Sequence, residues 1–134
     1  MSNIHATDAQ WAALRAHAER PGTVTMLNLL KFRDSAIYSQ HPDEPPRTGA
    51  DAYAFYAALA LPIVSSHGGR TVFAGSLSDA VIGPAMREWD QVLLVEYPST
   101  ATFIQMVESE EYRAISYHRS AALEDSRLTP IFGH

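Results

Sequence analysis

The order of the apolar segments constrains this chain more than any other feature. Two strand-like blocks, residues 23–32 and 89–97, are rich in valine, leucine and other residues that favour strands. A helical pattern follows each block, and another strand candidate follows each helical pattern. The predicted order is therefore βαββαβ, two strand–helix–strand units in tandem, with an extra helix over about residues 8–20 in front.

Local signals mark where the helices begin. Thr7 and Gln10 have the spacing of a capping box, in which each side chain satisfies a free backbone N–H of the first turn. Thr48 is placed to cap the next helix, which two consecutive glycines end at residues 68–69. Ser99 and Ser109 are placed to begin the helices of the second half.

The remaining segments are less regular. Residues 70–77 and 80–82 read as one bulged strand or a broken pair of strands, and residues 127–132 supply the last strand. Residues 34–48 form a loop, and connections of that length are frequently lids or binding loops. A solvated insertion without a role is the alternative for this loop.

The predicted order is that of the ferredoxin-like α+β fold, a four-stranded antiparallel sheet with helices on one face. Alternation along residues 23–32 places Val24, Met26 and Asn28 on one face, and Leu27 and Leu29 on the other. A bare apolar sheet face has to be buried, and a second copy of the chain is the simplest partner. We expect one domain, with its core over about residues 22–132, that forms a homodimeric α/β barrel through the sheet face.

Composition excludes several classes of function. The chain has no cysteine, so disulfides, thiolate metal sites and cysteine nucleophiles are absent. Its net charge of −5 and its lack of a basic stripe argue against nucleic acid as a partner. The six histidines are scattered without metal-ligand spacing, and no glycine pattern for phosphates or dinucleotides occurs, so we expect no metal and no cofactor. Without a signal-like or membrane-spanning segment, we expect a cytoplasmic protein that does not enter a membrane.

Several segments together resemble the domain of unknown function 1330 family, from about Thr23 to Leu128. The segments that carry the resemblance are Met26–Phe32, His67–Arg70, Trp89-Asp90, Val95–Ser99, Ser109–Tyr112 and His118-Arg119. The resemblance implies the dimeric α/β barrel fold. It implies no activity, because that family is itself uncharacterised; related groups include cofactor-free monooxygenases, muconolactone isomerases, haem enzymes and ligand sensors.

Three polar residues in otherwise apolar elements are candidates for catalysis. A buried amide at Asn28 can polarise a substrate carbonyl, or it can bond a neighbouring backbone group. Glu96 lies inside a strand, where a carboxylate either is paired with an arginine or acts as a base. His118 is a general base near neutral pH or a packed histidine at the end of a helix.

Four further residues are candidates for binding a substrate. Arg70 and Arg119 are available to pair with Glu96, and an arginine left over can fix a substrate carboxylate. Tyr53 and Tyr56 are three residues apart on the second helix and face the sheet, either as substrate-binding groups or as core residues whose hydroxyls lie at a pocket rim.

These residues predict a cofactor-independent enzyme that acts on a small acidic or aromatic molecule. Its pocket lies between sheet and helices and is closed by residues 34–48. The alternative is a non-catalytic homodimer, ligand-binding or structural, in which the same polar groups pair with one another.

Overall fold

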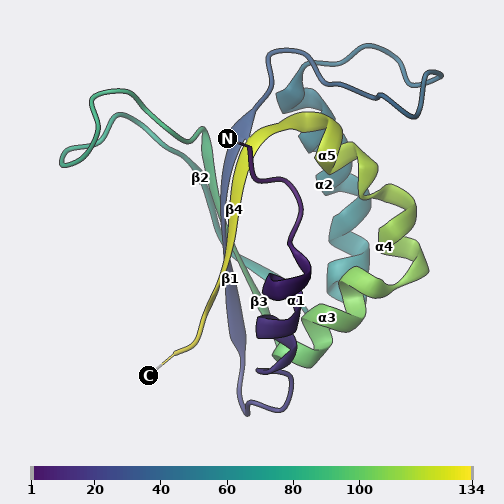
Figure 1. The fold of residues 1–134 in the computed structure, drawn as a ribbon, viewed down its shortest axis with the longest axis vertical. Coiled ribbons are helices and arrows are strands. Elements are labelled where there is room, and N and C mark those ends of the chain that lie inside the picture. The colour runs from purple at the N-terminus through teal and green to yellow at the C-terminus, as the bar shows by residue number, and fades with distance from the viewer. Residues whose placement is uncertain (1, 134) are drawn as a thin grey trace.

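The computed structural model describes residues 2–133 and contains one antiparallel sheet with the strand order β2-β3-β1-β4. The helices all cover the same face of this sheet (Figure 1). The order βαββαβ is confirmed, as is the extra N-terminal helix, so the fold is ferredoxin-like α+β. The elements are α1 (Asp8–Arg15), β1 (Val24–Phe32), α2 (Gly49–Ser66), β2 (Arg70–Ser76), β3 (Gln91–Tyr97), α3 (Thr100–Glu108), α4 (Glu110–Ile115), α5 (Tyr117–Ala122) and β4 (Leu123–Ile131).

The predicted helix caps form in the structure. The Thr7 hydroxyl accepts from the Gln10 N–H at 3.1 Å, and the Gln10 side chain accepts from the Thr7 N–H at 2.9 Å. Thr48, Ser99 and Ser109 each accept a backbone N–H in the first turn of the helix that follows. These caps are local in sequence, so sequence alone was sufficient to find them.

Three predicted boundaries were wrong. Helix α1 ends at Arg15 rather than near residue 20, and the chain continues through turns. Strand β4 starts at Leu123 rather than at 127, because the chain becomes extended directly after α5. Leu123 is buried next to the last residues of α5, so its apolar side chain fits the helical pattern as well as the strand. Residues 80–82 form no strand: β2 stops at Ser76, which pairs with Gln91, so no partner strand continues beside them.

The sheet has two different faces. Val24, Met26 and Leu30 of β1 are buried beneath the helices, together with Val95 and Tyr97 of β3. On the opposite face, Leu27 is paired with Leu94, and Leu29 with Val92. We call this opposite side the open face; its central leucines and valine are only half-buried, and Phe73 and Ile131 beside them are exposed.

Candidate functional site

Asn28 lies under the helices in the middle of β1 and is 8% exposed. Its amide nitrogen donates to the backbone oxygens of Met26 at 3.3 Å and Leu93 at 3.2 Å. Both N–H groups of the side chain therefore have partners within the sheet. These contacts correspond to the alternative in which Asn28 bonds neighbouring backbone groups rather than a substrate.

Glu96 and Arg70 lie on the open face, on the other side of the sheet from Asn28. The Arg70 Nε atom donates to Glu96 Oε1 at 3.2 Å, and the two residues face each other across the β2–β3 pair. The predicted ion pair is present, but it lies outside any space between sheet and helices. Asn28 and Glu96 therefore do not share a site within one chain.

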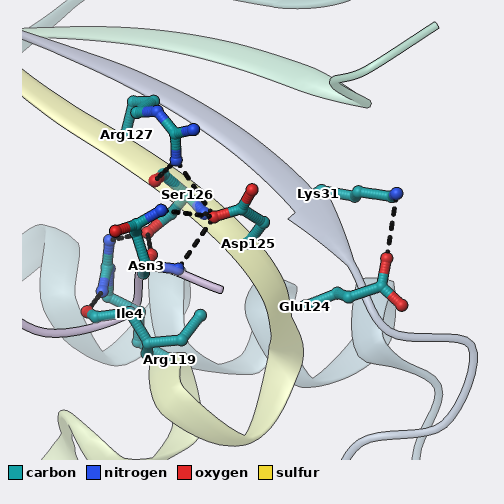
Figure 2. Close-up of polar contacts among 8 residues, drawn as sticks. All are labelled: Asn3, Ile4, Lys31, Arg119, Glu124, Asp125, Ser126 and Arg127. Atoms are coloured by element: carbon teal, nitrogen blue, oxygen red, sulfur yellow. Dashed lines mark hydrogen bonds and ion pairs between the residues drawn. The ribbon is translucent and has the colours of Figure 1, made fainter. Parts of the chain in front are cut away.

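Arg119 is occupied in fastening the N-terminal segment (Figure 2). Its guanidinium donates to the backbone oxygen of Ile4 at 3.0 Å and to the Ser126 hydroxyl at 3.4 Å. Nearby, the Asn3 N–H donates to Asp125 at 2.9 Å, which ties the same segment to β4 (Figure 2). The side chain thus joins three parts of the chain rather than pointing a free charge at a cavity.

Tyr53 and Tyr56 are buried between α2 and the rest of the core. The Tyr56 hydroxyl lies 2.7 Å from that of Tyr112 on α4. Burial raises the pKa of Tyr53 to about 12, and burial with the nearby Tyr112 raises the pKa of Tyr56 well above its usual value. Both hydroxyls therefore stay protonated at neutral pH, and both rings fill the core.

His118 is the one predicted catalytic residue that the structure brings into a polar side-chain cluster. It is only 3% exposed, and its Nδ1 atom lies 2.8 Å from the Tyr38 hydroxyl. Arg47 donates to the same Tyr38 oxygen at 3.2 Å. A histidine, a tyrosine and an arginine thus meet at one phenolic oxygen, where the loop 34–48 packs on α5.

Glu44 completes the cluster. Its carboxylate accepts from Arg47 at 2.8 Å and from the Tyr117 hydroxyl at 2.7 Å, and it lies 3.8 Å from His118 Nε2. We call Tyr38, Glu44, Arg47, Tyr117 and His118 the loop cluster. Aromatic rings surround it: His41 stacks on Tyr117 with 3.8 Å between ring centroids, and Phe55 lies beside His118.

The environment of the loop cluster fixes its charges. Burial lowers the pKa of His118, and this outweighs the opposing effect of the Glu44 carboxylate. The hydrogen bonds from Arg47 and Tyr117 lower the pKa of Glu44. At neutral pH the cluster therefore contains a neutral imidazole between a phenol and a carboxylate.

One hydrogen-bond arrangement satisfies all of these groups. Arg47 has only donors, so the Tyr38 oxygen accepts from it and gives its own proton to His118 Nδ1. The neutral imidazole then carries its proton on Nε2, which faces Glu44. This assignment follows from the hydrogen-bond network. It gives a hydrogen bond from the Tyr38 hydroxyl to the imidazole, while the carboxylate of Glu44 lies 3.8 Å from Nε2, beyond hydrogen-bond distance.

Sequence reasoning missed four members of this cluster, the three loop residues and Tyr117. Tyr38, Glu44 and Arg47 belong to the loop, and their contacts reach about eighty positions along the chain to Tyr117 and His118. The available signal was the acidic and basic pair three residues apart, Glu44 and Arg47, within an otherwise proline-rich loop. Nothing local to the loop indicates that α5 would supply its partner.

Two surface hollows lie away from all of these residues. One hollow of about 490 Å³ is formed by Trp11, Arg15 and neighbours on α1, α3 and α4, and another of about 480 Å³ lies near Pro21 and Phe132. Among residues 2–133, no group of three histidine, aspartate or glutamate side chains is arranged to ligate a metal. None of the helices in this range has both the length and the apolar content needed to cross a bilayer.

The family model described as "Domain of unknown function (DUF1330)" matches residues 47–131. Two crystal structures of the RPA0582 protein are similar along almost the whole chain, each with a TM-score of 0.90. The methylated form is 39% identical and the match covers 99% of this chain and 96% of that one. The form described as a protein of unknown function from Rhodopseudomonas palustris is 37% identical, with 100% and 98% covered.

A more distant structure shares the fold alone. It is a dimeric protein of unknown function with a ferredoxin-like fold from Bacteroides fragilis, 14% identical, with a TM-score of 0.55 and 84% of this chain and 97% of that one covered. None of the curated proteins compared with this chain matches it.

Proposed function

The chain belongs to the domain of unknown function 1330 family, and within that family we propose that it transfers protons on a small organic molecule at Tyr38. The observation that carries the proposal is the 2.8 Å contact between the Tyr38 hydroxyl and His118, with an arginine on the same oxygen. Such a step uses the chain's own groups and is cofactor-independent.

The proposed step runs along the hydrogen bond between Tyr38 and His118. Tyr38 gives its proton to His118 Nδ1, and the resulting phenolate oxygen takes a proton from an acidic C–H or O–H of the substrate. In the return step, Tyr38 gives its proton to the product and takes back the proton that His118 holds. This restores the neutral imidazole. Arg47 offsets the negative charge on the Tyr38 oxygen, and Glu44 offsets the positive charge on the imidazole.

Accessibility assigns the roles within the pair. His118 is buried, whereas Tyr38 is half-buried on the loop, so we assign the contact with a substrate to Tyr38. Tyr38 is thus the proposed catalytic residue, and His118 acts through it. The exposed His41 ring on Tyr117 gives the site an aromatic rim on which a planar acidic or aromatic molecule can lie.

The other predicted residues take different roles in this proposal. We assign Asn28, Tyr56 and Arg119 to structure, because their polar groups bond to backbone atoms or to the hydroxyl of Tyr112. Tyr53 joins them because its ring is buried in the core. The Arg70–Glu96 pair is assigned to the open face.

Hydrogen–deuterium exchange tests the proposal without knowledge of the full reaction. The protein is incubated in deuterated water with a panel of small oxo acids, lactones and phenolic ketones, and loss of C–H signals is followed by NMR. We expect at least one compound to exchange faster with the protein. Tyr38→Phe should slow that exchange by about a hundredfold, the usual contribution of a general acid–base group.

Tyr117→Phe is the matched control. It removes a hydroxyl from the same cluster, but that hydroxyl contacts Glu44 rather than the imidazole. Full exchange by Tyr38→Phe would contradict the proposal. So would equal losses in both variants, because they would show that exchange depends only on the order of the loop.

A non-catalytic homodimer, ligand-binding or structural, is the second candidate. It is favoured by the contacts within the loop cluster: Glu44 pairs with Arg47 and lies beside His118 of α5. These contacts hold the loop against α5 without any substrate. This candidate predicts that no compound of the panel exchanges faster, while Tyr38→Phe still lowers the unfolding temperature.

For either candidate we propose that two copies associate through their open faces. The apolar centre of this face, from Leu27 and Leu29 to Val92 and Leu94, supports the proposal, as does the Bacteroides fragilis protein of the same fold that is described as dimeric. Two ion pairs border the centre, Arg70 with Glu96 and Arg127 with Asp125, so the border carries both positive and negative charges. Such a border can complement itself across a twofold axis.

A further inference from the structure

The connection between β2 and β3 carries the most exposed apolar side chains described in the structure. We call residues 78–89 the arm. Val81 is 100% exposed, Ile82 is 95% exposed and Met86 is 83% exposed, so their side chains make almost no contact within the chain. Large apolar groups gathered in this way on a surface usually mark an interaction site.

The base of the arm is fixed to the sheet. The Leu77 N–H donates to the backbone oxygen of Asp90 at 3.0 Å, and the Asp90 N–H donates to that of Leu30 at 2.7 Å. The Asp90 carboxylate also accepts the Phe32 N–H at 2.8 Å. Beyond this base, the arm projects to the side of the sheet away from the helices (Figure 1). It therefore extends into the space in front of the open face.

We propose that the arm packs against a second copy of the chain that is docked on the open face. This inference rests on the homodimer proposed above and adds a second, separate contact to it. A body seated on the open face lies on the side to which the arm projects (Figure 1). The arm then buries Val81, Ile82 and Met86 on the partner, and symmetry repeats the contact.

The area of the interface supports this assignment. Strands of seven to nine residues in a four-stranded sheet present roughly 450 Å² of flat surface. A stable interface buries about 800 Å² of accessible surface on each partner, and contacts beyond the flat sheet add to the area that a sheet-to-sheet contact buries. Two arms, each with three large exposed apolar side chains, provide such additional contact area.

The charges of the arm favour a protein partner over an anionic bilayer. Asp79 and Glu88 outnumber Arg87, so the arm has a net negative charge. The open side of a second copy offers exposed cations, including Arg70 and Arg127. A loop that inserts into anionic lipid normally has basic residues beside its apolar tip.

The first test replaces the three apolar side chains of the arm by serine, V81S/I82S/M86S. Because these side chains make almost no contacts within the chain, the variant should fold as the unchanged protein does. We expect its dimer dissociation constant, measured by sedimentation over a concentration series, to rise by about a hundredfold or more. Leu61→Ser, an exposed apolar residue of α2 in the helix layer, should leave the constant unchanged.

The outcomes separate this inference from the dimer itself. A triple variant that dimerises as well as the unchanged protein, while Leu27→Arg on the open face dissociates, overturns the arm contact and leaves the dimer intact. If the unchanged protein is a monomer at every concentration, both the dimer and the arm contact are overturned. Binding of the unchanged protein, but not the triple variant, to vesicles of neutral and anionic lipid with no change in dimerisation would assign the arm to membranes and overturn the inference.

A second test identifies the contact directly. The chain has no cysteine, so Ile82→Cys provides a single attachment point for a photocrosslinker. Light and ¹⁵N-labelled copies are mixed and allowed to exchange before irradiation. We expect the tip of the arm to form light–heavy crosslinked peptides, as a contact between copies requires. If both peptides of every crosslinked pair carry the same label, the crosslinks form within one chain, and this would contradict the inference.

Discussion

At the residue scale, the two most informative polar side chains are satisfied in different ways. Asn28 gives both of its amide protons to backbone carbonyls within the sheet. His118 instead bonds to side chains of a loop that is distant in sequence. The first arrangement uses both amide protons within the sheet, whereas the second joins a buried imidazole to a half-buried tyrosine of the loop.

The contacts of Asn28 predict the effect of a charge at this position. Asn28→Asp places a carboxylate beside two carbonyl oxygens, and we expect it to lower the free energy of unfolding by about 3 kcal/mol at neutral pH. The loss should shrink in acid, because protonation removes the charge. Asn28→Leu, similar in size and uncharged, should cost about 1 kcal/mol, as measured by urea unfolding. Equal losses for the two variants would show that the carbonyls do not face the side chain.

The lowered pKa of His118 predicts a dependence of stability on pH. The unfolded chain binds a proton at this histidine near pH 6.5, whereas the folded chain binds it only at lower pH. The free energy of unfolding should therefore fall as pH decreases through 6.5 toward the folded pKa, and should not depend on this group above that range. A second loss should follow below about pH 4.5, where the favourable contacts of Glu44 are protonated away.

Two variants check this prediction. His118→Gln should abolish the first loss seen in urea unfolding at a series of pH values, and His5→Gln on the exposed N-terminal segment should retain it. A pH profile that His118→Gln leaves unchanged would show that the imidazole titrates equally in both states.

At the element scale, the loop 34–48 depends on a close approach of three backbones. The Gly49 N–H donates to the Arg33 oxygen at 3.0 Å, and the Arg33 N–H donates to the Ala122 oxygen at 2.9 Å. This contact joins the end of β1, the start of α2 and the end of α5. It brings both ends of the loop to the helix that supplies Tyr117 and His118.

Gly49→Ala tests this arrangement. An added Cβ would lie less than 3.0 Å from backbone atoms of both Arg33 and Ala122, so the junction must open. We expect a loss of about 3 kcal/mol in the free energy of unfolding, with altered NMR signals of Tyr38 and His118. Gly133→Ala, which meets nothing within 4 Å, is the matched control. An unchanged stability would indicate that the backbones are not in contact.

Sequence predicted the elements well where their signals are local. Thr7, Thr48, Ser99 and Ser109 mark helix starts through side chains that bond within three residues. It failed where the outcome depends on what lies next to a segment in space. Residues 80–82 have strand-forming side chains but no neighbouring strand. The loop cluster needs partners about eighty positions apart, so its composition was visible in the sequence and its geometry was not.

At the scale of the whole molecule, one sheet separates two kinds of surface. The covered side carries the hydrophobic core, and the open side carries half-buried leucines and Val92 beside exposed Phe73. The apolar alternation in β1 was enough to predict that both faces would be apolar. What it could not predict is that Glu96 would lie on the open face while Asn28 lies under the helices.

The proposed dimer predicts the effect of a charge at the centre of the open face. Leu27→Arg should raise the dimer dissociation constant by roughly a hundredfold, because two buried arginines would meet near the twofold axis. The monomer should retain its circular dichroism spectrum, since Leu27 is only half-buried within one chain. Leu61→Arg on the outer side of α2 is the control for sedimentation. A dimer that tolerates Leu27→Arg would have to use another surface.

The central claim is that Tyr38 and His118 form a poised proton-transfer pair, and a ¹⁵N NMR titration of the histidine rings tests it most directly. We predict that His118 is neutral at pH 7, with its proton on Nε2 and a bare Nδ1, and that it titrates below pH 6.5. Tyr38→Phe should shift the Nδ1 signal. A charged imidazole at pH 7, or a proton on Nδ1, would contradict the claim, because His118 could then not accept the proton of Tyr38.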